Sequence, residues 1–152
     1  MNSPAQLVVF QLDDWRYALR LADVLRVVMA AEITPLPRAP EIVTGVINIQ
    51  GDIVAVLNIR IRFGLPWRDI EPGDHLLIAT TPRRVVALFV DSVAGMVTRP
   101  EDDITGPGKI LPNLPYVAGV MKLEDGLIFI HNLESFLSIE EEAALEEAMT
   151  AG

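Results

Sequence analysis

Few side chains in this sequence could act as nucleophiles or metal ligands. The chain has no cysteine, which excludes disulfides and thiolate metal sites. His75 and His131 each fall at the edge of an apolar run, and neither has a second ligand at the spacing that a metal site needs. Lys109 and Lys122 lack the apolar surroundings that would activate an amine. The sequence therefore predicts no metal centre and no cofactor.

The acidic residues do not form a recognisable catalytic motif either. Glu101-Asp102-Asp103 lacks the spacing of an EF-hand, and a solvated loop is its simpler interpretation. The sequence also lacks a Gly-x-Ser-x-Gly elbow, a phosphate loop and a dinucleotide fingerprint. Because enzymes need converging titratable groups or a cofactor, these absences favour a binding module over an enzyme.

Composition narrows the choice of partner. The chain has 152 residues, of which 51% are hydrophobic and 22% charged, as expected of about one globular domain. Its net charge of −9 disfavours binding to nucleic acid or to anionic membranes. No apolar run approaches the roughly 20 residues of a membrane span, and the N-terminus has no signal-peptide pattern. We therefore expect a cytoplasmic protein without membrane insertion.

Short apolar runs separated by turn residues predict a mainly β fold. Asp23 could begin a brief helix through Val28. A tight turn is expected at Gly51-Asp52, and Asn58 could cap a short helix. Ser138 and Glu141 form a capping box that opens a C-terminal helix, with Ile139, Leu145 and Met149 on one side. Paired strands are expected at 7–12 with 15–21, 45–50 with 52–57, 75–80 with 85–90, and 116–123 with 127–131, with a further strand at 93–98 and a long loop over 99–115.

One segment of the sequence is echoed 74 positions later. The run that starts at Gly45 aligns without a gap with the run that starts at Gly119, and Asn58 then falls on Asn132. Each copy reads as a strand, a turn, a buried strand and an Asn-led short helix. This indicates two similar β units, each with its own hairpin.

The run from Gly45 to Gly64, GVINIQGDIVAVLNIRIRFG, resembles the central motif of the CheW-like domain family. Three further segments, 17–24, 84–93 and 116–137, resemble other parts of that family in the same order. The resemblance covers residues 5–138. It implies two packed SH3-like small β barrels with short helices, followed by an acidic C-terminal helix and tail over 139–152.

The resemblance also implies a function and partners. Members of this family are non-catalytic adaptors of bacterial chemotaxis. They join a CheA-type histidine kinase to the cytoplasmic tips of chemoreceptors. The resemblance points to Val24, Arg26, Gln50 and Gly51 as receptor-binding candidates, and to Val93 and Met96 as kinase-binding candidates.

Two of these positions depart from the family pattern. The family usually has Glu where this chain has Arg26, and Arg where it has Gln50. A Glu–Arg pair would make a charge-assisted contact, whereas a hydrogen bond between Arg26 and Gln50 would join a cation to a neutral amide. The change could be neutral drift in an exposed pair, or it could mark an altered partner. A divergent scaffold of another kinase pathway and a small-ligand-binding β protein therefore remain alternatives.

Overall fold

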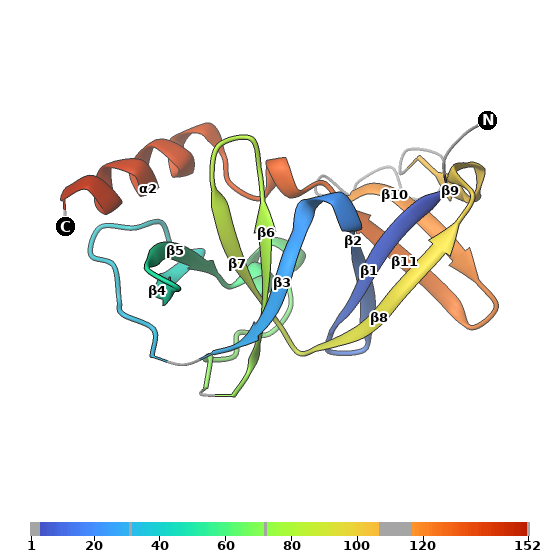
Figure 1. Cartoon of the computed structure of the whole chain (residues 1–152), viewed down its shortest axis with the longest axis horizontal. Helices are drawn as coiled ribbons and strands as arrows, with labels where there is room; N and C mark the ends of the chain where they lie inside the picture. The colour runs from blue at the N-terminus through green and yellow to red at the C-terminus, as the bar shows by residue number, and fades with distance from the viewer. Residues whose placement is uncertain (1–3, 31, 72, 107–116, 152) are drawn as a thin grey trace. The chain divides into compact units, whose positions relative to one another are not determined.

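The computed structural model describes residues 4–30, 32–71, 73–106 and 117–151 (Figure 1). It is mainly β with one α-helix at the C-terminal end of the described chain, as the sequence predicts. The chain divides into two compact units. Unit 1 consists of Met1–Val24 and Asp91–Leu133, and unit 2 consists of Leu25–Val90 and Glu134–Gly152. Unit 1 is therefore assembled from two separate segments of the sequence.

Unit 1 is a six-stranded sheet in the order β8-β1-β2-β11-β10-β9. Most neighbours are antiparallel, but β2 and β11 run parallel. Leu7, Ala18, Met121 and Ile128 belong to its fully buried aliphatic core. The strands are β1 (Ala5–Leu12), β2 (Trp15–Arg20), β8 (Ser92–Arg99), β9 (Ile104–Thr105), β10 (Val117–Leu123) and β11 (Gly126–His131), with 3₁₀ turns η1 (Leu21–Asp23) and η3 (Glu101–Asp103).

Unit 2 is a five-stranded sheet in the order β3-β6-β7-β5-β4. Here β5 and β7 form the parallel pair. Val56, Leu76, Ala87 and Phe89 lie in its core. The elements are β3 (Val24–Met29), β4 (Val43–Ile49), β5 (Asp52–Leu57), β6 (His75–Thr80) and β7 (Val85–Val90), with 3₁₀ turns η2 (Ile59–Phe63) and η4 (Leu133–Ser135), and the helix α2 (Ile139–Ala151).

The echo in the sequence corresponds to a repeat in the strand pairing. In the β4–β5 hairpin, Ile49 pairs with Asp52 and Val43 with Leu57. In the β10–β11 hairpin the equivalent pairs, each 74 positions later (123 − 49), are Leu123 with Gly126 and Val117 with His131. Both hairpins also shift register two residues after their first pair. The prediction of two similar β units is therefore confirmed.

Several local predictions are wrong by one element or one residue. The segment after Asp23 forms strand β3 rather than a helix, because Val24, Val27 and Val28 are β-branched and suit a strand. The β4–β5 turn is Gln50-Gly51, and Asp52 already belongs to β5. The expected loop contains η3 and β9, and its residues 107–116 lie outside the described residues. The first strand of the last hairpin is expected to begin at residue 116, which also lies outside the described residues, and β10 is described from Val117.

Two caps form as predicted. The Asn58 side chain accepts a hydrogen bond from the Arg60 backbone N–H at 3.3 Å and caps η2. At the start of α2, the Glu141 N–H donates to Ser138 Oγ at 3.0 Å and the Ser138 N–H donates to Glu141 Oε1 at 2.9 Å. The buried face of α2 differs from the prediction. Leu145 is buried and Met149 is half-buried, but Ile139, the first residue of α2, is 77% exposed.

Candidate functional site

A pocket of about 230 Å³ lies in unit 2, where β3 meets the turn between β4 and β5. Its polar lining consists of Arg26, Gln50, Asp52 and Arg84. The rest of the lining is apolar and comes from Leu25, Ile49, Ile53, Val54, Ile78, Val85 and Met149. A mainly apolar pocket with a few converging polar groups is a typical binding site.

The turn that presents Gln50 has a defined geometry. Gln50 has φ of 52° and Gly51 has φ of 94°, which is the pattern of a type I′ hairpin turn. The Gly51 N–H donates to Asn48 Oδ1 at 2.8 Å, which holds the turn in place. Because glutamine rarely adopts a positive φ, its position in this turn carries some strain.

The four receptor-binding candidates do not all lie at the pocket. Arg26 and Gln50 line the same pocket, although no hydrogen bond joins these two described residues. The hydrogen bond between Arg26 and Gln50 that the sequence allowed is therefore not formed in this structure. Gly51 lies beside the pocket in the turn, and Val24 begins β3 outside the pocket lining. Only two of the four candidates thus share one site.

Strand β3 is an exposed apolar edge of the unit 2 sheet. Leu25, Val27 and Met29 are 53%, 42% and 70% exposed, whereas Val28 packs against the core. Side chains alternate along a strand, so these three share the face opposite Val28. As an edge strand, β3 pairs with β6 on one side only. Such an edge is a surface on which a partner can dock.

The kinase-binding candidates lie on the edge strand of the other sheet. Val93 and Met96 belong to β8, which pairs only with β1. Met96 is 57% exposed and Val93 is half-buried. Their strand has the same sequence of buried and exposed positions as β3, 69 residues earlier (93 − 24), so that Val93 corresponds to Val24. Val24 and Arg26 on β3, and Val93 and Met96 on β8, thus occupy equivalent edge strands of the two units.

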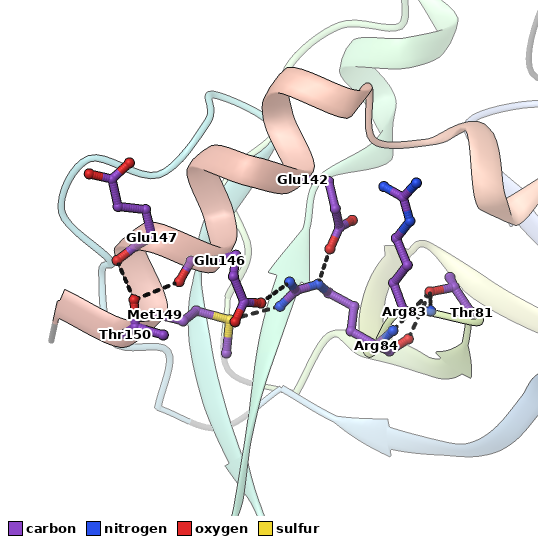
Figure 2. A network of polar contacts seen from close by, with 8 residues as sticks. All are labelled: Thr81, Arg83, Arg84, Glu142, Glu146, Glu147, Met149 and Thr150. Atoms are coloured by element: carbon purple, nitrogen blue, oxygen red, sulfur yellow. Dashed lines mark hydrogen bonds and ion pairs between the residues drawn. The ribbon is translucent and has the colours of Figure 1, made fainter.

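Sequence reasoning missed the Arg84 side of the pocket. Arg84 precedes β7 and contacts three residues of α2, as Figure 2 shows. Its Nε donates to Glu142 Oε1, its Nη2 donates to Glu146 Oε2 at 2.7 Å, and its Nη1 lies 3.2 Å from the Met149 sulfur. Burial lowers the pKa of this guanidinium, but the hydrogen bonds to the two carboxylates outweigh burial and raise it. The i, i+4 spacing of the two glutamates is the signal that could have indicated a cation opposite them.

His131 is not at the pocket. It ends β11 in unit 1, is 5% exposed, and packs against the rings of Phe10 and Tyr17, with centroids 5.4 Å and 4.6 Å away. Burial lowers its pKa to about 3, so it is neutral at pH 7. His75 is exposed at the start of β6. In the part of the chain that the structure describes, no group of three metal-ligating side chains occurs.

The CheW-like domain model matches residues 6–141 of this chain. The chain belongs to the CheW-like domain family. A chemotaxis protein CheW from Rhizobium meliloti is 29% identical over 94% of both chains, and one from Treponema pallidum is 25% identical over 90% of this chain and 84% of its own. Protein FrzA from Myxococcus xanthus is 31% identical over 64% of this chain and 61% of its own.

A solved structure agrees with the family assignment. The crystal structure of scaffolding protein TtCheW from Thermoanaerobacter tengcongensis has a TM-score of 0.81 and 29% identity, covering 91% of this chain and 95% of that one. The agreement supports the predicted fold of two SH3-like β units. Among the described residues, no helix is both long and apolar enough to span a bilayer.

Proposed function

We propose that this protein is a non-catalytic scaffold of chemotaxis signalling that couples chemoreceptors to a CheA-type histidine kinase. The family membership supports the scaffold role, because the relatives include proteins named for chemotaxis and one named as a scaffold. Receptor binding is assigned to unit 2 because its strand β3 is exposed and apolar and lies beside the pocket that Arg26 and Gln50 line. On this proposal β8, with Val93 and Met96, provides the kinase side.

Chemistry at the pocket argues for binding rather than catalysis. Among the described residues a single carboxylate, Asp52, lines it, whereas acid–base catalysis by carboxylates needs a second group with a shifted pKa. The apolar lining and the two arginines instead suit a protein segment with an apolar side chain and an acidic group.

Calorimetric titration tests the proposed function directly. The full-length protein is titrated with the kinase's regulatory domain and, separately, with a receptor tip from the same genome. We expect micromolar association with both. If neither kinase nor receptor associates, the adaptor role is wrong.

A charge reversal at the pocket tests the receptor side. Replacing Arg26 with Glu and Gln50 with Arg restores the charges usual for the family at these two positions and keeps an arginine at the pocket, so it is expected to tighten receptor binding by roughly three- to tenfold. The measurement is the receptor dissociation constant by calorimetry. The matched control swaps the exposed pair Arg16 and Asp125, whose atoms Nη2 and Oδ1 are 3.1 Å apart in unit 1, and it should leave receptor binding unchanged.

The same variant also tests the second candidate function, a scaffold of another kinase pathway. Arg26 and Gln50 depart from the family pattern, which favours a scaffold of another kinase pathway as the alternative. If the reversal leaves receptor affinity unchanged while the wild-type protein binds a kinase, the alternative gains support and the receptor assignment of the pocket fails.

A further inference from the structure

The helix α2 has a small apolar contact with the rest of unit 2. Leu145 and Ala148 are its buried side chains among the residues described. A 13-residue helix is marginal in water without tertiary contacts, so α2 depends on what holds it. Its other attachments are charged: Glu141 binds Arg62, while Glu142 and Glu146 both bind Arg84.

Arg84 is positioned by its own hairpin and does not need α2 to hold its backbone. The Thr81 N–H donates to the Arg84 carbonyl at 2.8 Å, and the Arg84 N–H donates to Thr81 Oγ1 at 3.1 Å (Figure 2). Only 13% of its side chain is exposed, although one of its two carboxylate partners, Glu146, is 65% exposed. The backbone of Arg84 is therefore held by its own hairpin, while its guanidinium is held by side chains of α2.

Arg84 and Met149 belong to the same pocket as Arg26 and Gln50. The end of α2 thus forms one wall of the candidate receptor site. Arg26, Arg84 and one carboxylate, Asp52, line this pocket, and Arg84 is already paired with Glu142 and Glu146 of α2. Without these two glutamates, the lining would carry two cations against one carboxylate. Such a pocket is complementary to an acidic segment, and α2 already supplies one.

We propose that α2 is an internal competitor, and that an acidic helical segment of the protein partner displaces its Glu142 and Glu146 from Arg84. The inference rests on the proposed function in so far as the pocket is taken as the partner's site. Because Arg84 and Glu142 are only 13% and 14% exposed, leaving this guanidinium unpaired would be costly, so Glu142 and Glu146 can leave it only when a partner's carboxylates replace them. Partner affinity is then set partly by how firmly α2 is held.

The first test uses the full-length protein and a labelled synthetic peptide with the sequence of residues 138–152. The variant E142Q/E146Q is expected to bind this peptide in trans, measured by fluorescence anisotropy, while the wild-type protein binds it about tenfold more weakly because its own α2 competes. Adding R84Q should abolish the gain, and R84K should retain part of it because the charge remains. Circular dichroism checks that each variant is folded.

The matched control is E140Q/E147Q. It removes the same charge from the exposed face of α2, where neither side chain contacts Arg84. Hydrogen exchange of the α2 amides should be about tenfold faster in E142Q/E146Q than in this control. Equal exchange in the two variants, or peptide binding that R84Q does not reduce, would overturn the proposal.

The second test separates this inference from the proposed function. Receptor-tip binding by E142Q/E146Q should be about threefold or more tighter than by the wild-type protein. If no variant binds a receptor although the peptide result holds, the adaptor role fails and the competition at Arg84 stands. If the receptor binds with the same affinity in both proteins, the competition fails and the adaptor role stands.

Discussion

Lowering the pH from 6.5 to 4 is expected to destabilise unit 1 by about 3 kcal/mol through His131 alone. In the folded protein burial keeps the pKa of His131 at about 3, whereas in the unfolded chain it returns to 6.5. Below pH 6.5 the unfolded state therefore binds a proton that the folded state does not. The free energy of unfolding falls by about 1.4 kcal/mol per pH unit until the pH passes 3.

The measurement is urea denaturation at several pH values, followed by Trp15 fluorescence in a Trp67→Phe background. Trp15 reports unit 1 because its ring lies 5.9 Å from that of Phe129, on β11. His131→Phe should remove this part of the pH slope. The control, His75→Gln, alters the exposed histidine and should keep the wild-type slope. A His131→Phe slope equal to that of the wild type would show that this residue is protonated in the folded state.

Gly45→Ala is expected to destabilise the protein by about 3 kcal/mol or more, and the equivalent change Gly119→Ala by about 2 kcal/mol. A Cβ at residue 45 would lie 2.4 Å from the Thr34 carbonyl oxygen. This oxygen cannot move freely, because it accepts the Val46 N–H at 2.8 Å. At residue 119 the nearest atom is Cγ2 of Ile104 at 2.6 Å, a methyl on a β-branched side chain that is stiff at χ1, and the nearest backbone oxygen, that of Thr105, is farther away at 3.3 Å.

Both variants are compared by thermal and urea denaturation with Gly106→Ala, where a Cβ would meet nothing within 4 Å and φ is not positive. This control should be close to neutral. The two glycines can be compared directly, because they occupy the same place in two hairpins with the same register. An equal cost at residues 45 and 119 would mean that the β4 strand can move away from Thr34.

The hairpins could be predicted because each is local. Turn residues and apolar runs lie next to one another in the sequence, and the gapless echo at Gly45 and Gly119 reflects two hairpins with one pairing pattern. The segment from Val24 to Met29 was harder, because Asp23 is a good helix cap while the valines that follow favour a strand. Here the strand preference and the pairing with β6 override the cap.

The candidate site could be predicted only in part. Arg26 and Gln50 came from the family pattern, and the structure places both at one pocket. Arg84 and Met149 were missed because they are 65 residues apart and meet only through the docking of α2. The pattern of apolar residues within one strand or helix does not predict a contact between side chains of two distant elements. The one available signal was the pair of glutamates on a helix with little apolar surface.

The division of unit 1 into two segments has a consequence for the order of synthesis. The strands of unit 2, from β3 to β7, are complete once Val90 has left the ribosome, and its segment from Glu134 onward, which contains α2, is added later. By contrast β1 and β2 are made first but find their neighbours β8 and β11 only after most of the chain exists. Among the described strands, the first to be made are therefore among the last to be enclosed. They present an apolar hairpin to the cell throughout translation, and Asp13 and Asp14 at its turn place charge beside that exposed surface.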